Sequence, residues 1–219
     1  MLNSILKNNF HSILFLIFVL ILAGCSSSKF KSKWLQTESP QYFKAVFTTT
    51  RGDFEIKSYR KWSPQGVDRL YQLITYGYFD SVPVYRMIPN YVAQFGKPDS
   101  IINSQWGQKK VLDEPVIEKN VFGTMAFARD TINTRGLQLF INLKNNSPRL
   151  DTIHYSGVTG FPVIAKVTSG MKNVKAFFSY GAKPMNDYDS ISKDNLFIRR
   201  KYPKIDYILK AEITTVKEK

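Results

Sequence analysis

The chain has few of the residues on which most enzyme chemistry depends. Its 219 residues include one cysteine, Cys25, and two histidines, His11 and His154. A single cysteine can form neither an intrachain disulfide nor a thiolate cage for a metal ion. His11 lies in an N-terminal segment that we expect to be removed, which leaves His154 alone. The mature chain therefore has no two-histidine metal site, and no metal or cofactor is predicted.

Acidic residues are also scarce. The chain carries 17 Asp and Glu against 31 Lys and Arg, which gives a formal net charge of +14. Such an excess of basic residues favours an anionic partner, either nucleic acid or an anionic membrane. Hydrophobic residues make up 43% of the chain and aromatic residues 14%, which is too much for a disordered protein. The length suits one domain of ordinary size, or two small ones, with a real core.

The first 24 residues have the features of an export signal. Lys7 is their only charged residue, and an apolar run extends from Ile13 to Ala23. This run is well short of the about 20 residues of a transmembrane helix and matches the apolar region of a secretory signal. Residues 22–25, Leu-Ala-Gly-Cys, resemble the lipobox of a bacterial lipoprotein, in which the cysteine is acylated. A plain signal peptide followed by an incidental cysteine is the alternative.

The residues after Cys25 are typical of a tether. Residues 26–40 are polar and begin with three serines. Their lysines either favour anionic headgroups or are simply solvated. Serine directly after Cys25 favours the outer membrane, so we predict a protein of the bacterial cell envelope, lipid-anchored and facing the periplasm. The predicted parts are a signal peptide at 1–24, a lipidated flexible tether at 25–41 and a folded domain at 42–219.

From Tyr42 onward, apolar residues alternate with polar ones, as they do on half-buried strands. Phe43, Ala45 and Phe47 fall on one face, and the next segment, from Phe54, repeats the pattern. Residues 50–53, Thr-Arg-Gly-Asp, separate the two segments and have the composition of a hairpin turn. The remaining apolar segments of strand length are 82–88, 91–95, 124–128, 139–143, 161–167 and 207–216.

Two segments have the spacing of apolar residues that predicts a helix. The first begins at Ser63-Pro64, with Ser63 as the expected N-cap, and ends at Gly77. The second covers residues 170–178. The segments without periodicity, predicted to be loops, are 97–119 and 187–204. Many short strands with only two helices favour an antiparallel barrel whose ends the helices cover.

Several short segments, taken in order, resemble the cyclophilins. Ser63-Pro64 and residues 77–80 (Gly-Tyr-Phe-Asp) are similar to that family's helix start and Gly-Phe-Tyr-Asp. Residues 84–91 (Val-Tyr-Arg-Met-Ile-Pro-Asn-Tyr) and 94–96 (Gln-Phe-Gly) are similar to its Phe-His-Arg-Val-Ile-Pro-Gly-Phe and Gln-Gly-Gly. The remaining similar segments are 123–129, 138–142, 150–151 and 162–171. Their order and spacing identify the region 42–216 as a member of the cyclophilin superfamily.

The resemblance implies a mainly β fold, a closed eight-stranded antiparallel barrel capped by two α-helices. It also implies peptidyl-prolyl cis-trans isomerase activity. Rotation about an X-Pro bond is slow because resonance of the nitrogen lone pair with the carbonyl creates a barrier of about 18–20 kcal/mol. Catalysis needs a donor to that nitrogen in the twisted state and an apolar pocket for the ring, with no metal or nucleophile. A chain almost without His and Cys can supply both.

Family position assigns the site residues. Arg86 is the implied catalytic donor, because its guanidinium is rigid and permanently charged, and Gln94 is expected to hold it and to bind the substrate backbone. Ala128 and Arg129 are expected to offer main-chain groups to the residue before proline. The implied substrate-binding residues are Tyr91, Val92, Ala128, Arg129, Gln138, Phe140, Leu150 and His154. Whether His154 closes the pocket is left open. Counting forward from Leu150-Asp151 places His154 there, whereas counting back from the following strand places Phe161 there instead.

Four departures from the family pattern bear on activity. Tyr85 stands in place of His beside Arg86, which leaves the mechanism intact. Phe95 replaces Gly and is expected to place a bulky ring beside the groove, and Leu137 and Asp130 are further differences. Phe95, Leu137 and Asp130 keep open the alternative of a catalytically weak peptide-binding module or chaperone tethered to the membrane.

The partners predicted from these arguments are proline-containing segments of exported proteins and, through Cys25, a lipid membrane. We expect a monomer. Nucleic acid is not a predicted partner, because no nucleic-acid motif or aromatic and basic platform accompanies the positive charge.

Overall fold

The computed structural model describes residues 30–97, 99–194 and 196–217. The chain divides into two units, residues 1–31 and 32–219, and the helices and strands of the described residues belong to the second. The predicted export signal at 1–24 and the predicted acylation site at Cys25 lie outside the described residues.

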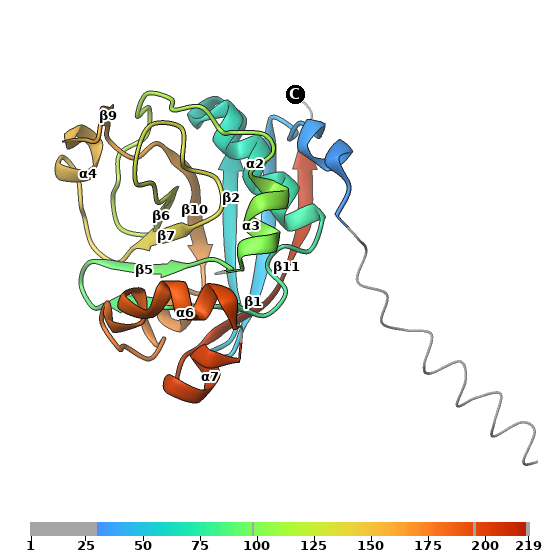
Figure 1. Ribbon diagram of the computed structural model, residues 1–219. Helices are drawn as coiled ribbons and strands as arrows, with labels where there is room; N and C mark the ends of the chain where they lie inside the picture. Colours follow the sequence, from blue (N-terminus) through green and yellow to red (C-terminus); the bar gives the residue numbers. More distant parts are fainter. Residues whose placement is uncertain (1–29, 98, 195, 218–219) are drawn as a thin grey trace, which may run out of the picture. The chain divides into compact units, whose positions relative to one another are not determined.

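The second unit is built on one nine-stranded antiparallel sheet (Figure 1). In order across the sheet, its strands are β3 (Val82–Pro83), β11 (Tyr207–Lys217), β1 (Tyr42–Thr49), β2 (Phe54–Tyr59), β10 (Val163–Ser169), β6 (Thr124–Phe127), β7 (Leu139–Asn142), β5 (Val92–Phe95) and β4 (Arg86–Ile88). A separate hairpin pairs β8 (His154–Tyr155) with β9 (Val158–Thr159). The mainly β, antiparallel architecture is the one predicted from the alternation of apolar residues.

The two outermost strands of the sheet belong to one stretch of chain. Only Val84 and Tyr85 separate β3 from β4, and the Val84 N–H donates to the Asp206 carbonyl just before β11, at 2.8 Å. The sheet is therefore strongly curled, and its first and last strands meet end to end rather than side by side. The expected segment 82–88 is interrupted at residues 84–85, which gives nine strands in place of the predicted eight.

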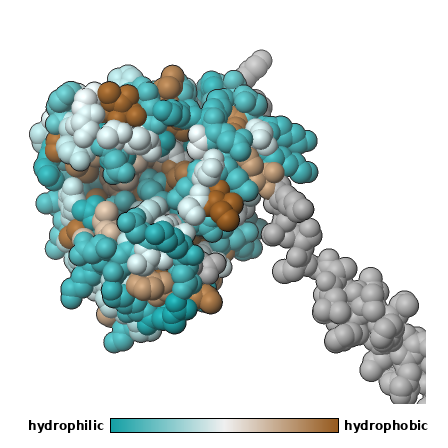
Figure 2. Space-filling view, viewed as in Figure 1, coloured by the Kyte–Doolittle hydropathy of each residue, from teal (hydrophilic) through white to brown (hydrophobic). Residues whose placement is uncertain are grey.

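Aromatic side chains fill the inside of the curled sheet. On β1, Phe43, Ala45 and Phe47 are completely buried, as the alternation predicted. The Phe47 ring stacks on Phe54 of β2 with the centroids 4.9 Å apart. Burial of each such side chain contributes roughly 1.5–3 kcal/mol. On the face that Figure 2 shows, hydrophilic residues predominate and hydrophobic ones form small separate patches, which is usual for a folded domain.

Helix α2 (Pro64–Thr75) lies where the sequence predicts it, but its N-terminus is capped differently. Ser63 makes no side-chain cap. Instead, the Glu114 carboxylate accepts a hydrogen bond from the Gln65 N–H at 2.9 Å and another from the Ser63 hydroxyl. Burial raises the pKa of Glu114, but these hydrogen bonds outweigh it and lower the pKa below its usual value. A carboxylate also suits the positive end of the helix dipole. Ser63 is thus the N-cap residue, as predicted, but the side chain that accepts from the helix N-terminus is Glu114.

Two stretches predicted to be loops contain short helices. These are α3 (Ser100–Trp106), α6 (Tyr188–Lys193) and α7 (Phe197–Lys201), and η3 (Lys183–Asp187) leads directly into α6. Helices α3, α6 and α7 each bury a single residue, Trp106, Ile191 and Ile198 respectively. One buried position per helix cannot produce a helical periodicity, so tertiary packing rather than sequence pattern defines these helices.

We call residues 179–205, which include η3, α6 and α7, the helical segment 179–205. Figure 1 shows α6 and α7 at the opposite end of the sheet from α2. The second predicted helix is the shorter α5 (Met171–Lys175), and the remaining helices are η1 (Ser32–Gln36), η2 (Arg60–Trp62) and α4 (Arg149–Thr152).

The folded part of the chain begins before residue 42. Within η1, Trp34 is 8% exposed and Leu35 is 3% exposed. The Trp34 ring stacks on Tyr76 at the end of α2, with the centroids 4.6 Å apart and the planes nearly parallel. Residues 32–36 are therefore packed on the domain, and the expectation of a flexible tether as far as residue 41 was wrong for this part.

Candidate active site

A β-hairpin places Arg86 beside Gln94. Strands β4 and β5 are antiparallel and pair these two residues directly, so their side chains lie on the same face. Arg86 Nη1 donates to Gln94 Oε1 at 3.0 Å. Gln94 is 6% exposed, which makes it a fixed support for the guanidinium.

The next strands add an apolar floor. Phe140 on β7 pairs with Gln94 on one side and with Ala126 of β6 on the other. Phe140, Ala126, Val92 and Leu150 form one buried cluster, against which Tyr91, Ala128 and Phe161 pack. The curl of the sheet thus brings the Arg86–Gln94 pair to the edge of a hydrophobic surface.

These residues line a cavity of about 220 Å³, which we call the Arg86 groove. Its lining consists of Arg86, Tyr91, Val92, Gln94, Ala128, Arg129, Asp130, Phe140, Arg149, Leu150, Ile153, Tyr155, Phe161 and Met185. Of the ten predicted catalytic and substrate-binding residues, the structure brings eight together here. The two that do not line the cavity are Gln138 and His154.

Arg86 keeps one donor free. Its guanidinium carbon lies 5.7 Å from the centre of the Tyr91 ring, a cation–π distance. The Tyr91 hydroxyl accepts from Arg149 Nη1 at 3.3 Å. Arg86 Nε is buried and, among the residues that the structure describes, no acceptor contacts it. Leaving a buried donor unsatisfied costs roughly 1–3 kcal/mol, so this N–H is prepared for an acceptor on a bound molecule.

Arg129 supports one wall of the groove. Its Nη1 donates to the Tyr155 carbonyl at 3.1 Å and its Nη2 to the carbonyls of Val158 and Gly160 at 3.0 and 3.1 Å. The guanidinium also lies 4.7 Å from the centre of the Phe161 ring. Burial lowers the pKa of Arg129 below its usual value. Both Nη groups are therefore used by the β8–β9 hairpin and the following Gly160, while Nε is buried without an acceptor among the described residues.

The Ala128 N–H is already used in the same wall. It donates to the Gln138 carbonyl at 2.8 Å, so the main-chain group that Ala128 can offer to a peptide is its carbonyl. Beside it, Asp130 is exposed and lines the groove.

Phe161, not His154, closes the pocket. The Phe161 ring lies edge-on to Phe140 with the centroids 5.6 Å apart. His154 is exposed, and its Nδ1 lies 3.0 Å from the Thr159 hydroxyl across the β8–β9 hairpin. The expectation of His154 as a pocket residue was therefore wrong. Counting forward from Leu-Asp missed that the β8–β9 hairpin turns His154 outward and returns the chain to the groove at Phe161.

Phe95 does not reach the groove. It is completely buried and packs inside the curled sheet, 6.4 Å from Phe47 and 6.1 Å from Phe79 between ring centroids. The expected bulky ring beside the groove is thus absent, because residues alternate between the two faces of β5 and Gln94 takes the groove side.

Three groove residues had no signal in the sequence. Met185 comes from η3, about 100 residues after Arg86, Ile153 directly follows α4, and Tyr155 comes from the β8–β9 hairpin. None of them belongs to a periodic segment or to a motif. Only the tertiary fold brings them to the groove.

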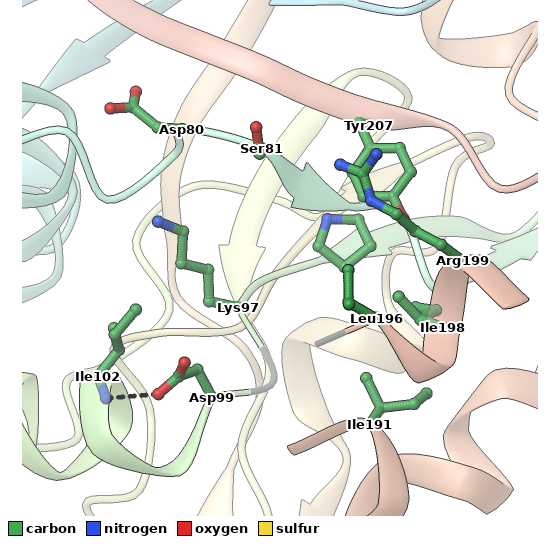
Figure 3. Close-up of a pocket in the computed structure, with 11 residues that line it drawn as sticks. Asp80, Ser81, Lys97, Asp99, Ile102, Ile191, Leu196, Ile198, Arg199 and Tyr207 are labelled. Carbon is green, nitrogen blue, oxygen red and sulfur yellow. Dashed lines mark hydrogen bonds between the residues drawn. The ribbon is translucent and has the colours of Figure 1, made fainter. Parts of the chain in front are cut away.

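A larger cavity lies elsewhere on the domain (Figure 3). We call it the Lys97 cavity, and its volume is about 310 Å³. Its lining residues are Asp80, Ser81, Pro83, Lys97, Asp99, Ile102, Ile191, Leu196, Ile198, Arg199 and Tyr207. Two of its charged groups have structural roles. Asp99 Oδ1 accepts from the Ile102 N–H at 2.9 Å and caps α3, and the Arg199 guanidinium lies 4.7 Å from the centre of the Tyr207 ring.

The described residues contain neither a metal-binding cluster nor a membrane-spanning helix. Within 30–97, 99–194 and 196–217, no group of three or more His, Cys, Asp and Glu side chains could hold a metal ion. In the same part of the chain, no helix is long and apolar enough to cross a membrane.

Comparison with known proteins agrees with this geometry. Residues 44–195 match the family model described as cyclophilin type peptidyl-prolyl cis-trans isomerase/CLD. A peptidyl-prolyl cis-trans isomerase-like 1 of Aspergillus fumigatus is 30% identical over 135 residues, which cover 59% of this chain and 78% of that protein. The peptidyl-prolyl cis-trans isomerase cypE of Dictyostelium discoideum is 29% identical over 133 residues, which cover 58% of this chain and 79% of that protein.

Solved structures give the same fold. A crystal structure of a cyclophilin type isomerase of Cryptosporidium parvum superposes with a TM-score of 0.56 at 15% identity, covering 80% of this chain and 99% of that one. The structure of the same protein in the presence of the dipeptide Ala-Pro superposes with a TM-score of 0.56 at 16% identity, covering 78% of this chain and 99% of that one. The chain therefore belongs to the cyclophilin-type peptidyl-prolyl cis-trans isomerase family.

Proposed function

We propose that the chain catalyses cis-trans isomerisation of X-Pro bonds in peptide segments of other proteins. The observation that carries this proposal is the Arg86–Gln94 pair at the edge of an apolar pocket, with a buried Arg86 Nε that has no acceptor among the described residues. Both requirements of the reaction, a fixed donor and an apolar site for a ring, meet in one groove.

The proposed mechanism is preferential binding of the twisted peptide bond. In the planar bond, the proline nitrogen shares its lone pair with the carbonyl and is a poor acceptor. In the twisted state the lone pair is localised, and Arg86 can donate a hydrogen bond to it. This bond exists only near the transition state, so it lowers the barrier without tightening the ground state. No bond to the protein is formed or broken.

The groove walls fit the rest of the substrate. Phe140, Val92 and Leu150 are buried and apolar, which suits the proline ring. Gln94 and the main chain at Ala128 and Arg129 supply polar groups for the neighbouring peptide.

Isomerisation of a short X-Pro peptide tests the proposal. The parent chain is expected to accelerate the reaction, and Arg86→Ala is expected to remove most of the acceleration while the peptide still binds. No acceleration by the parent, together with tight peptide binding in both proteins, would instead support the alternative of a peptide-binding module. Asp130, an exposed acid on the groove wall, is the observation that favours this second candidate.

We also propose that the chain acts in a bacterial envelope, anchored through acylated Cys25 in the outer membrane and facing the periplasm, on exported proteins. The support for this proposal comes from the sequence alone, namely the apolar run at 13–23 followed by Leu-Ala-Gly-Cys. The two relatives described above add no support, because they come from a fungus and from Dictyostelium. Several fatty chains, at about 0.8 kcal/mol per buried CH₂, would anchor stably. Cys25→Ser is expected to abolish fatty-acid labelling and release the protein from membranes, and labelling that persists would contradict the assignment.

A further inference from the structure

A chain of side-chain hydrogen bonds leads from Arg86 away from the groove. Arg86 Nη1 donates to Gln94 Oε1 at 3.0 Å, and Gln94 Nε2 donates to the Tyr85 hydroxyl at 2.9 Å. The Tyr85 hydroxyl donates to Gln138 Oε1 at 2.6 Å. Gln138 Nε2 donates to the Tyr188 hydroxyl at 3.1 Å. Successive bonds thus join the catalytic guanidinium to the first residue of α6.

Each link of this chain has a fixed direction. Both glutamines accept at Oε1 and donate at Nε2, and Tyr85 accepts one bond and donates one. Reversing either amide would bring two donors together, or two acceptors, so the partners fix both amide orientations. Tyr85 is 3% exposed, which leaves water no access to replace a lost partner. Burial raises the pKa of Tyr85 well above its usual value, so its hydroxyl keeps its proton at neutral pH.

The far end of the chain is held by the helical segment 179–205. The Tyr188 ring lies edge-on to Tyr85 with the centroids 6.3 Å apart. Tyr85 also belongs to a buried cluster with Ile191, Ile198 and Tyr202. The tyrosine behind Arg86 is therefore fixed both by hydrogen bonds and by packing against this segment.

The absence of a side chain at Gly96 leaves room for this chain of hydrogen bonds. A Cβ placed on Gly96 would lie 2.0 Å from Gln138 Oε1, closer than any real contact. Gln138 thus occupies space that a side chain at position 96 would fill. Its Nε2 also approaches the Lys97 carbonyl at 3.4 Å, which supports the same amide orientation.

We propose that Tyr85, Gln138 and Tyr188 are positioning residues that, through Gln94, hold the Arg86 guanidinium in one orientation for catalysis. The helical segment 179–205 is then a working part of the site and not only a cover for the sheet. The inference rests on the proposed isomerase function for its kinetic consequences, and on geometry alone for its effect on Arg86.

Three variants of the full chain test it, and each removes only a hydroxyl. Tyr85→Phe leaves Gln94 Nε2 without its acceptor, so the turnover rate is expected to fall about tenfold. Tyr188→Phe, at the far end, is expected to lower it about threefold. The dissociation constant of an X-Pro peptide is expected to stay within about twofold in both, because the lost support acts on the transition state. The control is Tyr202→Phe, which removes a hydroxyl bonded to Asp187 in the same segment and is expected to leave the turnover rate unchanged.

A second readout does not depend on activity. The Arg86 Nε–H signal in a ¹H–¹⁵N spectrum is assigned by its loss in Arg86→Lys. It is expected to shift and to exchange faster with solvent in Tyr85→Phe and in Tyr188→Phe, and to remain in place in Tyr202→Phe. Because Tyr188 is only half-buried, its variant is expected to fold even where Tyr85→Phe is destabilised.

The outcomes separate the two proposals. An Arg86 Nε–H signal that stays in place in both Tyr85→Phe and Tyr188→Phe overturns the positioning role, whatever the turnover rates are. A shift of equal size in Tyr202→Phe overturns it as well, because the effect would then be one of packing. A parent chain without isomerase activity in which the Arg86 signal still moves overturns the proposed function and leaves the positioning role standing.

Discussion

Two of the domain's cavities differ in their chemistry, and the smaller of the two has the features of a catalytic site. The Arg86 groove, at about 220 Å³, is built on three sheet strands and contains an arginine with an unsatisfied N–H. The Lys97 cavity, at about 310 Å³, lies between the helical segment 179–205 and the loops before β3 and α3. Its arginine, Arg199, rests on a tyrosine ring and its Asp99 caps a helix. Each cavity holds a buried polar atom without a partner among the described residues, Arg86 Nε in the groove and the Tyr207 hydroxyl in the Lys97 cavity. What distinguishes the groove is that its free donor belongs to a fixed guanidinium beside an apolar floor.

The two arginines provide the strongest test of this difference. Arg86→Ala is expected to lower the isomerisation rate by about 100-fold, the order of effect seen when one preorganised transition-state donor is removed. Arg199→Ala, the matched change in the other cavity, is expected to leave the rate unchanged. The measurement is the rate of cis-to-trans conversion of an X-Pro peptide. Equal losses in the two variants would mean that the groove has no special role.

One apolar residue from each cavity separates binding from folding. Phe140→Ala opens the floor of the groove and is expected to weaken peptide binding by about 30-fold, which corresponds to about 2 kcal/mol. Ile191→Ala is expected to lower the free energy of unfolding by about 2–4 kcal/mol with peptide affinity preserved. Titration calorimetry and denaturant unfolding measure the two quantities. A loss of affinity in Ile191→Ala as large as in Phe140→Ala would contradict the assignment.

Gly96 lies between a residue that lines the Arg86 groove, Gln94, and one that lines the Lys97 cavity, Lys97. A change at Gly96 tests the hydrogen bonds that pass between them through Gln138. Gly96→Ala would force Gln138 away from Tyr85, and the turnover rate is expected to fall about tenfold, as in Tyr85→Phe. Combining Gly96→Ala with Tyr85→Phe is expected to cause little further loss, since both changes break the same chain of bonds. Fully multiplicative losses would show that the two residues act independently.

The smallest predicted effect is on stability and comes from Lys97. Burial lowers the pKa of Lys97 below its usual value, so its charged form is disfavoured in the folded state. Lys97→Met is therefore expected to raise the free energy of unfolding at neutral pH by up to about 1 kcal/mol, with no change in turnover rate. The gain is full where Lys97 is charged in both states and shrinks as the pH rises through its folded pKa. A gain that grows with pH in denaturant unfolding would contradict this.

Much of the groove could be predicted because its residues lie on strands. The alternation at 43–47 and 54–56 determines which face of β1 and β2 is buried, and the spacing of Arg86, Gln94 and Phe140 is carried by motifs within β4, β5 and β7. In such segments the side chain's direction follows from its position along the strand. The same rule, applied to β5, also explains why Phe95 points inward while Gln94 points to the groove.

The errors fall where a residue's direction depends on a distant partner. His154 and Phe161 could not be separated by counting, because a hairpin held by Arg129 decides which of them returns to the groove. Ser63 is the N-cap residue of α2, as predicted, but the carboxylate that accepts from the first N–H groups comes from Glu114, far along the chain, and no local pattern reveals it.

The sequence by itself determined the curled antiparallel sheet, the scarcity of metal-binding and nucleophilic residues, and the arginine and apolar residues of the groove. Local alternation and short motifs record these features, since each depends on neighbours a few residues away. Only the tertiary structure decided that Phe161 closes the pocket, that Met185 walls it, and that Tyr85, Gln138 and Tyr188 stand behind Arg86. These arrangements depend on contacts between residues up to about 100 positions apart, and no periodicity along the chain encodes such contacts.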